Sequence, residues 1–174
     1  MRSTKLFASR CRPGPALAAT ILAVALAGCQ GSPEPPRGIG QAAPITGPAP
    51  VVPAGQVTLA FEPFTGIPGN IADELARDIG IQARQANLTL VRRVGATATY
   101  RVNGYLSATS DRSSTTVFYV FDIVDASGRR VNRVSGTETA SGGAGDPWSS
   151  VDSSTLTRIA QRSVSQIQAW INRG

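Results

Sequence analysis

The sequence predicts an α+β fold with two helices packed on one face of a largely antiparallel sheet, in the order β-α-(β)-β-β-β-α. Apolar and polar residues alternate along three successive stretches between residues 100 and 139, which is the period of half-buried strands. Residues 71–86 and 156–171 place apolar side chains three and four apart, as amphipathic helices do. Strands that follow one another through short turns favour a meander, and helices flanking it favour the α+β class.

The first stretch of the chain has the composition of a secretory leader. Residues 1–12 carry four basic residues and no acid, and residues 16–27 are almost wholly apolar. This pattern is the charged and apolar part of a signal peptide, and it is too short to remain as a membrane-spanning helix. We therefore expect residues 1–28 to be removed from the mature protein.

The leader ends in Leu26-Ala27-Gly28-Cys29. Small residues at Ala27 and Gly28 let the backbone lie extended in a peptidase, and Cys29 supplies a thiol. The segment resembles the lipobox of bacterial lipoproteins. The resemblance implies cleavage between Gly28 and Cys29, a diacylglycerol on the Cys29 thiol and a fatty acyl chain such as palmitate on the new amino terminus. The open alternatives are an ordinary secretory signal with a chance cysteine, or an uncleaved anchor.

The resemblance also bears on location. Gln30 rather than Asp follows the cysteine, and in the enterobacterial sorting rule this favours the outer membrane. We expect a protein anchored by lipid to a bacterial membrane, with its domain in the periplasm.

Removal of the leader changes the charge balance. Four of the 17 basic residues lie in it and none of the 11 acids, which leaves 13 basic residues and a net charge of +2. The basic character of the whole chain is thus largely a property of the leader, and nucleic acid is not an expected partner.

The sequence offers little catalytic chemistry. It contains no His, Cys11 is lost with the leader and Cys29 is expected to be lipidated, so we expect no disulfide, no metal site, no cofactor and no Cys- or His-based catalysis. The remaining carboxylates have ordinary explanations at a helix start and at turns: Asp73, Glu74, Asp78, Asp122 and Asp125. The chain is therefore expected not to be an enzyme.

Three segments follow from these observations. Residues 1–28 are the signal peptide, residues 29–55 are the lipidated cysteine and a linker, and residues 56–174 are a single periplasmic domain. The linker is rich in Pro and Gly and has no period that builds a helix or strand, so it is expected to be a disordered tether. Fully extended, it would reach roughly 80 Å.

The first half of the domain is expected to begin with a strand from Val57 and a turn at 65–69. Asn70 then stands where a helix cap belongs, with Asp73 three residues later, as in a capping box. Residues 88–91 are predicted to form a short strand.

The second half is expected to contain strands at 100–108, 117–124 and 131–139, the last near an edge because it is more polar. Residues 140–147 form a glycine-rich loop, and Asp152, Ser153 or Ser154 caps the final helix. Trp148 and Trp170 are expected to anchor the core rather than bind a ligand.

The central strands support a second resemblance. Residues 100–106 read Tyr-Arg-Val-Asn-Gly-Tyr-Leu, with Gly104 inside the strand, and a turn follows at Asp125-Ala126-Ser127-Gly128. This pattern resembles periplasmic α+β lipoprotein domains: the penicillin-binding-protein activators, the curli secretion lipoprotein and the amino-terminal domain of TolB. The resemblance covers about a third of the chain and implies an architecture and docking onto envelope machinery, not pore formation.

Three functions remain open. The first is a non-catalytic accessory or adaptor module that binds an envelope protein through a sheet edge or loops. The alternative is a transport-auxiliary lipoprotein that binds an anionic lipid or glycolipid, with Arg129, Arg130 and Arg133 as candidate anion contacts. The third, an envelope hydrolase, is disfavoured because no residue pattern points to it.

Overall fold

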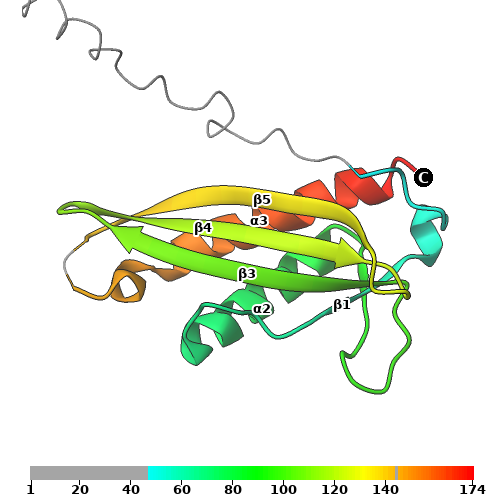
Figure 1. The fold of residues 1–174 in the computed structure, drawn as a ribbon, viewed down its shortest axis with the longest axis horizontal. Coiled ribbons are helices and arrows are strands. Elements are labelled where there is room, and N and C mark those ends of the chain that lie inside the picture. The colour runs from blue at the N-terminus through cyan, green and yellow to red at the C-terminus, as the bar shows by residue number, and fades with distance from the viewer. Residues whose placement is uncertain (1–46, 144) are drawn as a thin grey trace, which may run out of the picture. The chain divides into compact units, whose positions relative to one another are not determined.

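The computed structural model describes residues 47–143 and 145–174. The leader, the proposed lipidation site Cys29 and residues 30–46 of the expected linker lie outside the described residues. Within them the predicted α+β class is confirmed, as a five-stranded sheet with two helices (Figure 1).

The sheet combines an antiparallel meander with two parallel pairs. Its spatial order is β2-β1-β3-β4-β5, in which β3, β4 and β5 are antiparallel neighbours and β1 runs parallel to both β2 and β3. The predicted meander is confirmed, and its last strand lies at the edge as expected. The parallel pair β1 and β2 follows from the helix between them, because a crossover helix returns the chain to the same end of the sheet. The strands are β1 (Thr58–Phe61), β2 (Thr89–Leu90), β3 (Tyr100–Ser110), β4 (Ser114–Val124) and β5 (Arg130–Ser141).

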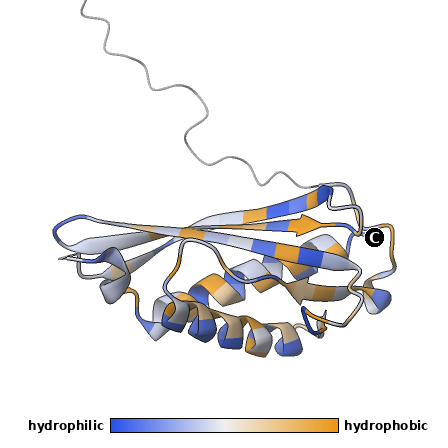
Figure 2. Ribbon diagram, turned by 60° about the horizontal axis from the view of Figure 1, so that its bottom comes forward, coloured by the Kyte–Doolittle hydropathy of each residue, from blue (hydrophilic) through white to orange (hydrophobic). Residues whose placement is uncertain are grey.

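Both helices cover the same face of the sheet. These are α2 (Gly69–Gln85) and α3 (Ser153–Ile171), and Figure 2 shows them together on one side of the strands. The start of α3 is as predicted, since the Asp152 carboxylate accepts a 2.8 Å hydrogen bond from the Thr155 N–H. Two short 3₁₀ helices, η2 (Ala54–Gln56) and η3 (Pro147–Ser150), complete the elements.

The predicted cap of α2 is wrong. The helix begins one residue before Asn70, directly after Pro68, and no side chain caps it. The turn before the helix is fixed from outside it, because the backbone of Thr65 exchanges hydrogen bonds with Gly104 and Leu106 of β3. That attachment sets where the chain turns, so Asn70 lies exposed inside the first helical turn.

The core lies between the sheet and the helices. Alternate residues of each long strand point toward the helices, and Phe121 of β4 stands at the centre with its ring 6.3 Å from Phe61 and 6.1 Å from Phe64. Trp170 is buried, 2% exposed, and its ring lies 5.1 Å from that of Tyr100. Trp148 is partly buried against the same core. The expectation that both tryptophans anchor the core is confirmed.

The residues just before β1 are attached to the domain. The Pro48 carbonyl accepts a hydrogen bond of 2.8 Å from the Trp170 Nε1–H, and the Gly47 N–H donates one of 3.0 Å to the Asn132 side chain. Val52 and Ala54 pack against the core. Residues 47–55, which were expected to belong to the linker, thus lie against the edge of the sheet and the end of α3.

The two ends of the sheet carry different elements. The proximal end is where residues 47–57 lead into β1, where β3 and β5 begin and where α3 ends. The distal end carries the turn at 111–113 between β3 and β4, together with η3. Among the described residues, no helix has the length and apolarity needed to cross a bilayer.

Candidate functional site

Among the described residues, no helix lies on one face of the sheet (Figure 2), and we call it the open face. Its middle holds Tyr105 and Phe118, which are 45% and 44% exposed. Tyr105 pairs with Val120 and Phe118 pairs with Ser107, so the two aromatic side chains are diagonal neighbours on adjacent strands. Most residues around them carry hydroxyl groups: Ser107, Thr109, Thr116, Ser135, Thr137 and Thr139.

Toward the proximal end, the open face becomes charged. Asn103, Asp122 and Arg133 stand side by side on β3, β4 and β5. The Arg133 guanidinium donates two hydrogen bonds to the Asp122 carboxylate, of 2.5 Å from Nε and 2.6 Å from Nη2. These bonds raise the pKa of Arg133 above its ordinary value. The planar, two-pronged geometry fixes both side chains.

The three arginines predicted as anion contacts lie close together, each beside a carboxylate. Arg133 and Arg130 share Asp122, with Arg130 at 3.7 Å, and Arg129 lies 3.1 Å from Asp125. Three positive charges thus stand against two negative ones. The cluster taken by itself is only weakly cationic.

A hollow of about 340 Å³ opens beside these residues at the proximal end. It lies between the loop before β3 and the turn between β4 and β5. Its two charged side chains have partners among neighbouring residues: Arg101 donates to Glu62 and to the Arg93 carbonyl, and the Asp125 carboxylate accepts from the Ser127 and Arg129 N–H groups. The hydrogen bond from the Ser127 side chain is the main cause that lowers the pKa of Asp125. Both charged side chains of the hollow are therefore already paired. Its lining residues are Ala96, Thr97, Ala98, Thr99, Arg101, Val124, Asp125, Ala126 and Gly128.

The carboxylates of α2 have structural partners. Arg77 lies 3.6 Å from Glu74 and 3.8 Å from Asp78, and Asp78 accepts a 2.8 Å hydrogen bond from the Thr157 hydroxyl of α3. Asp73 is exposed. Within residues 47–143 and 145–174, no three His, Cys, Asp or Glu side chains are grouped so that they could hold a metal ion.

One charged site was missed from the sequence. Glu138 of β5 points to the helix side, with its side chain 6% exposed, and lies 3.0 Å from Arg158 and 2.9 Å from Arg162 of α3. Burial raises the pKa of the neighbouring Tyr119, and the charge of Glu138 adds to the effect. A signal was present, because Glu138 breaks the inward-facing series of Asn132, Val134, Gly136 and Ala140, and two arginines four residues apart follow on the last helix.

No protein-family model matches the sequence, and no curated protein is significantly similar to it. Among solved structures, the chain is similar to two crystal structures of the PelC dodecamer from Paraburkholderia phytofirmans, one of them of a point variant. Both are 19% identical, with a TM-score of 0.42, and cover 67% of this chain and 90% and 91% of the respective PelC chain. At this level the similarity concerns the fold only.

Proposed function

We propose that this chain is a lipid-anchored, non-catalytic accessory module of the bacterial envelope, which binds a protein partner on the open face of its sheet. The lipobox at residues 26–29 supports the anchor, with lipid on Cys29 and the domain in the periplasm. Gln30 after the cysteine favours the outer membrane. The partner's surface would be apolar at its centre and rich in hydrogen-bonding groups around it.

The observation that carries this proposal is the pair Tyr105 and Phe118. Both are nearly half exposed at the middle of the open face, and covering an aromatic side chain there would bury a large apolar area. Exposed aromatic residues surrounded by hydroxyl groups match the usual composition of protein interfaces, in which an apolar centre has a polar rim. The charged pair Asp122 and Arg133 borders this centre on one side.

Site-specific photocrosslinking in intact cells tests the partner. A photoreactive amino acid replaces Phe118 in one variant and Gln161, on the exposed side of α3, in a control variant. We expect a reproducible adduct of defined mass from position 118 and none from position 161. Absence of any adduct at 118, or the same adducts at both positions, would contradict the proposed interface.

The anchor is tested separately. Cys29→Ser removes the thiol that would receive the diacylglycerol, so the variant should incorporate no radiolabelled fatty acid and accumulate as the longer precursor. The wild-type protein, labelled in parallel, is the control. Mature-sized protein from the Cys29→Ser variant would overturn the assignment of the lipobox.

A further inference from the structure

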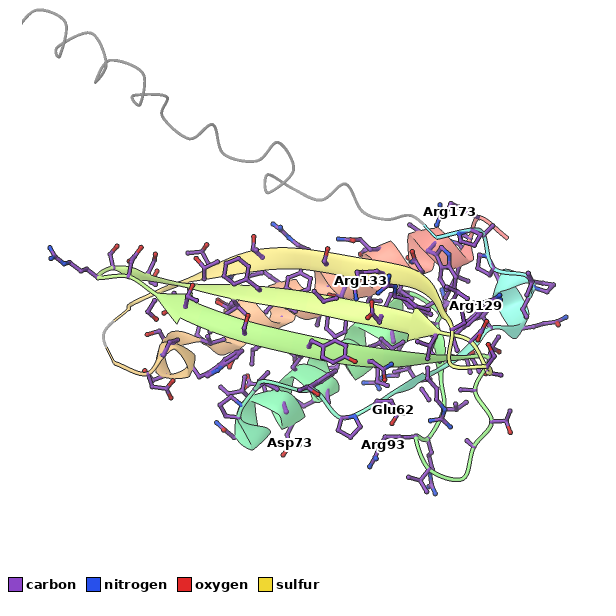
Figure 3. All side chains as sticks on the ribbon, in the orientation of Figure 1. Glu62, Asp73, Arg93, Arg129, Arg133 and Arg173 are labelled. Carbon is purple, nitrogen blue, oxygen red and sulfur yellow. The ribbon has the colours of Figure 1, made fainter. Side chains whose placement is uncertain are left out.

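The charges of the domain are separated along its length. The proximal end holds eight of the twelve described arginines and only three of the ten described acidic residues, which gives a side-chain charge of +5. The distal end holds four arginines and seven acids, which gives −3. In Figure 3, the labels of Arg93, Arg129, Arg133 and Arg173 all lie to the right of Asp73, toward the proximal end. The proximal arginines are Arg84, Arg92, Arg93, Arg101, Arg129, Arg130, Arg133 and Arg173, and the proximal acids are Glu62, Asp122 and Asp125.

Several parts of the chain bring these arginines together. The end of α2, which carries Arg84, lies beside the end of α3, because the Gln168 side chain donates to the Ala86 carbonyl. The loop at 91–99 is attached to the start of β3, where Arg101 donates to the Arg93 carbonyl. Arg129 lies in the turn between β4 and β5, and Arg130 and Arg133 follow it in β5. Arg173 comes directly after the end of α3.

Half of the proximal arginines are available to an outside anion. Within the part of the chain that the structure describes, no carboxylate lies within 4.0 Å of Arg84, Arg92, Arg93 or Arg173. All four are exposed. This set extends well beyond the carboxylate-paired cluster of Arg129, Arg130 and Arg133, and it accounts for most of the excess charge.

Exposed aliphatic side chains stand at the same end. Val51 is 95% exposed and Val94 is 73% exposed, the two highest values among the large apolar residues described. Val94 directly follows Arg92 and Arg93 in the loop at 91–99. Aliphatic side chains flanked by cationic ones are typical of surfaces that rest in the headgroup region of a membrane.

The chain also leaves the domain at this end. The hydrogen bonds of Gly47 to Asn132 and of Pro48 to Trp170 fix where the segment toward Cys29 begins. Seventeen residues lie between Gly47 and Cys29, which span about 55 Å in an extended polyproline conformation and about 25 Å in a flexible one. A lipid on Cys29 would keep the domain within this distance of a bilayer.

We propose that the proximal end docks onto the anionic phospholipid headgroups of a membrane, with the exposed arginines on phosphate groups and Val51 and Val94 at the interface. Guanidinium groups suit this role because they bind phosphate through two parallel hydrogen bonds. The proposal depends on the proposed lipid anchor only for bringing the membrane near. In this orientation the acidic distal end points away from the bilayer, and the open face of the sheet stands perpendicular to the membrane plane.

Vesicle cosedimentation tests this docking without the lipid anchor. The protein is the chain from residue 29 onward with Cys29→Ser, which keeps every described residue and the complete core. We expect binding to vesicles of phosphatidylcholine that also contain phosphatidylglycerol, no binding to phosphatidylcholine alone, and weaker binding as salt increases. Failure to bind the anionic vesicles at low salt would overturn the proposal.

A pair of double variants identifies the end that binds. Arg92→Gln with Arg93→Gln should weaken binding to the anionic vesicles roughly thirtyfold, from the usual effect of two cationic residues near a charged surface. Arg77→Gln with Arg112→Gln removes the same charge from the distal end and should leave binding within about twofold. Equal losses in the two pairs would contradict docking through the proximal end.

Val94→Ser examines the apolar contact. It should reduce binding severalfold while leaving the salt dependence unchanged, since no charge is lost. Unchanged binding would remove Val94 from the proposed contact. Circular dichroism of each variant confirms that its fold is kept. These results do not depend on photocrosslinking at Phe118, so loss of the membrane contact and loss of the protein partner are told apart.

Discussion

The indole N–H of Trp170 donates a hydrogen bond of 2.8 Å to the carbonyl of Pro48, 122 residues earlier in the chain. Trp170 is at the same time part of the core, with its ring against Tyr100. One side chain therefore joins the last turn of α3 to the sheet and to the segment that precedes β1.

Trp170→Phe should lower the free energy of unfolding more than Trp148→Phe does. Both changes replace an indole by a phenyl ring. Of the two indole N–H groups, only that of Trp170 has a hydrogen-bond partner among the described residues. The difference should be at least about 1 kcal/mol, the usual net effect of one such bond, because Trp170 is also the more deeply buried of the two. Urea denaturation followed by circular dichroism measures it, and equal losses would mean that the bond to Pro48 contributes nothing.

Gly104→Ala should destabilise the domain by about 1–3 kcal/mol, because an added methyl group overfills a packed core. A Cβ at Gly104 would stand 2.5 Å from a ring carbon of Phe64 and 2.9 Å from one of Phe121. Gly69→Ala at the start of α2 is the control, since nothing lies within 4 Å of the added carbon. It should be neutral or stabilising in the same urea titration.

Shortening Phe64 gives an internal check on that explanation. If the clash with Phe64 is the cause, Gly104→Ala combined with Phe64→Leu should be less destabilised than the sum of the two single changes. Simple additivity would point to another origin for the loss.

The turn between β3 and β4 should loosen in acid. The Asp111 carboxylate accepts hydrogen bonds from the Ser113 and Ser114 N–H groups, which lower its pKa from 3.8 to about 2. A carboxylate whose pKa is lower in the folded state stabilises the turn at pH values above 3.8, and this contribution is lost as the pH falls toward 2.

Amide chemical shifts across that pH range provide the measurement. The Ser113 and Ser114 amide protons should titrate with a midpoint near 2, and in Asp111→Ala this titration should vanish. A midpoint near 3.8 in the unmodified protein would show that the two hydrogen bonds do not form.

The ion pairs of Glu138 with Arg158 and Arg162 should lose different amounts of stability, depending on which partner is replaced. Arg158→Met leaves the buried Glu138 carboxylate with only Arg162, and should cost about 1–3 kcal/mol. Glu138→Met leaves two partly exposed arginines without this carboxylate and should change stability by less than about 1 kcal/mol. Thermal and urea unfolding of both variants and of the double variant tests this, and the double variant should be more stable than Arg158→Met alone. A double variant less stable than Arg158→Met would contradict this explanation.

The fold was predictable where local pattern and burial coincide. The alternation at 100–139 identified β3, β4 and β5 because one side of each strand packs on helices and the other faces solvent. A cap at Asp152, Ser153 or Ser154 was predictable because a capping side chain binds an N–H only two or three residues later. Asp152 is the one that forms it, with the Thr155 N–H. Both features depend only on residues that lie close together in the sequence.

Features that depend on distant residues were not predictable in the same way. The start of α2 is decided by the attachment of Thr65 to β3 rather than by Asn70. The pairing of Arg133 with Asp122 was also not predictable, because nothing in their spacing along the chain shows that the two stand opposite each other on adjacent strands. The charge separation likewise requires knowing which loops meet at one end.

The attachment of Pro48 to Trp170 has a practical consequence for labelling the protein. Gly174 lies against Pro50, and the Arg173 side chain donates to the Gly47 carbonyl, so the two ends of the described domain are neighbours. A fluorescent protein or affinity tag fused after Gly174 would crowd the proximal end and obstruct a bilayer there. The turn at 111–113, at the other end of the sheet, is the better position for an inserted epitope.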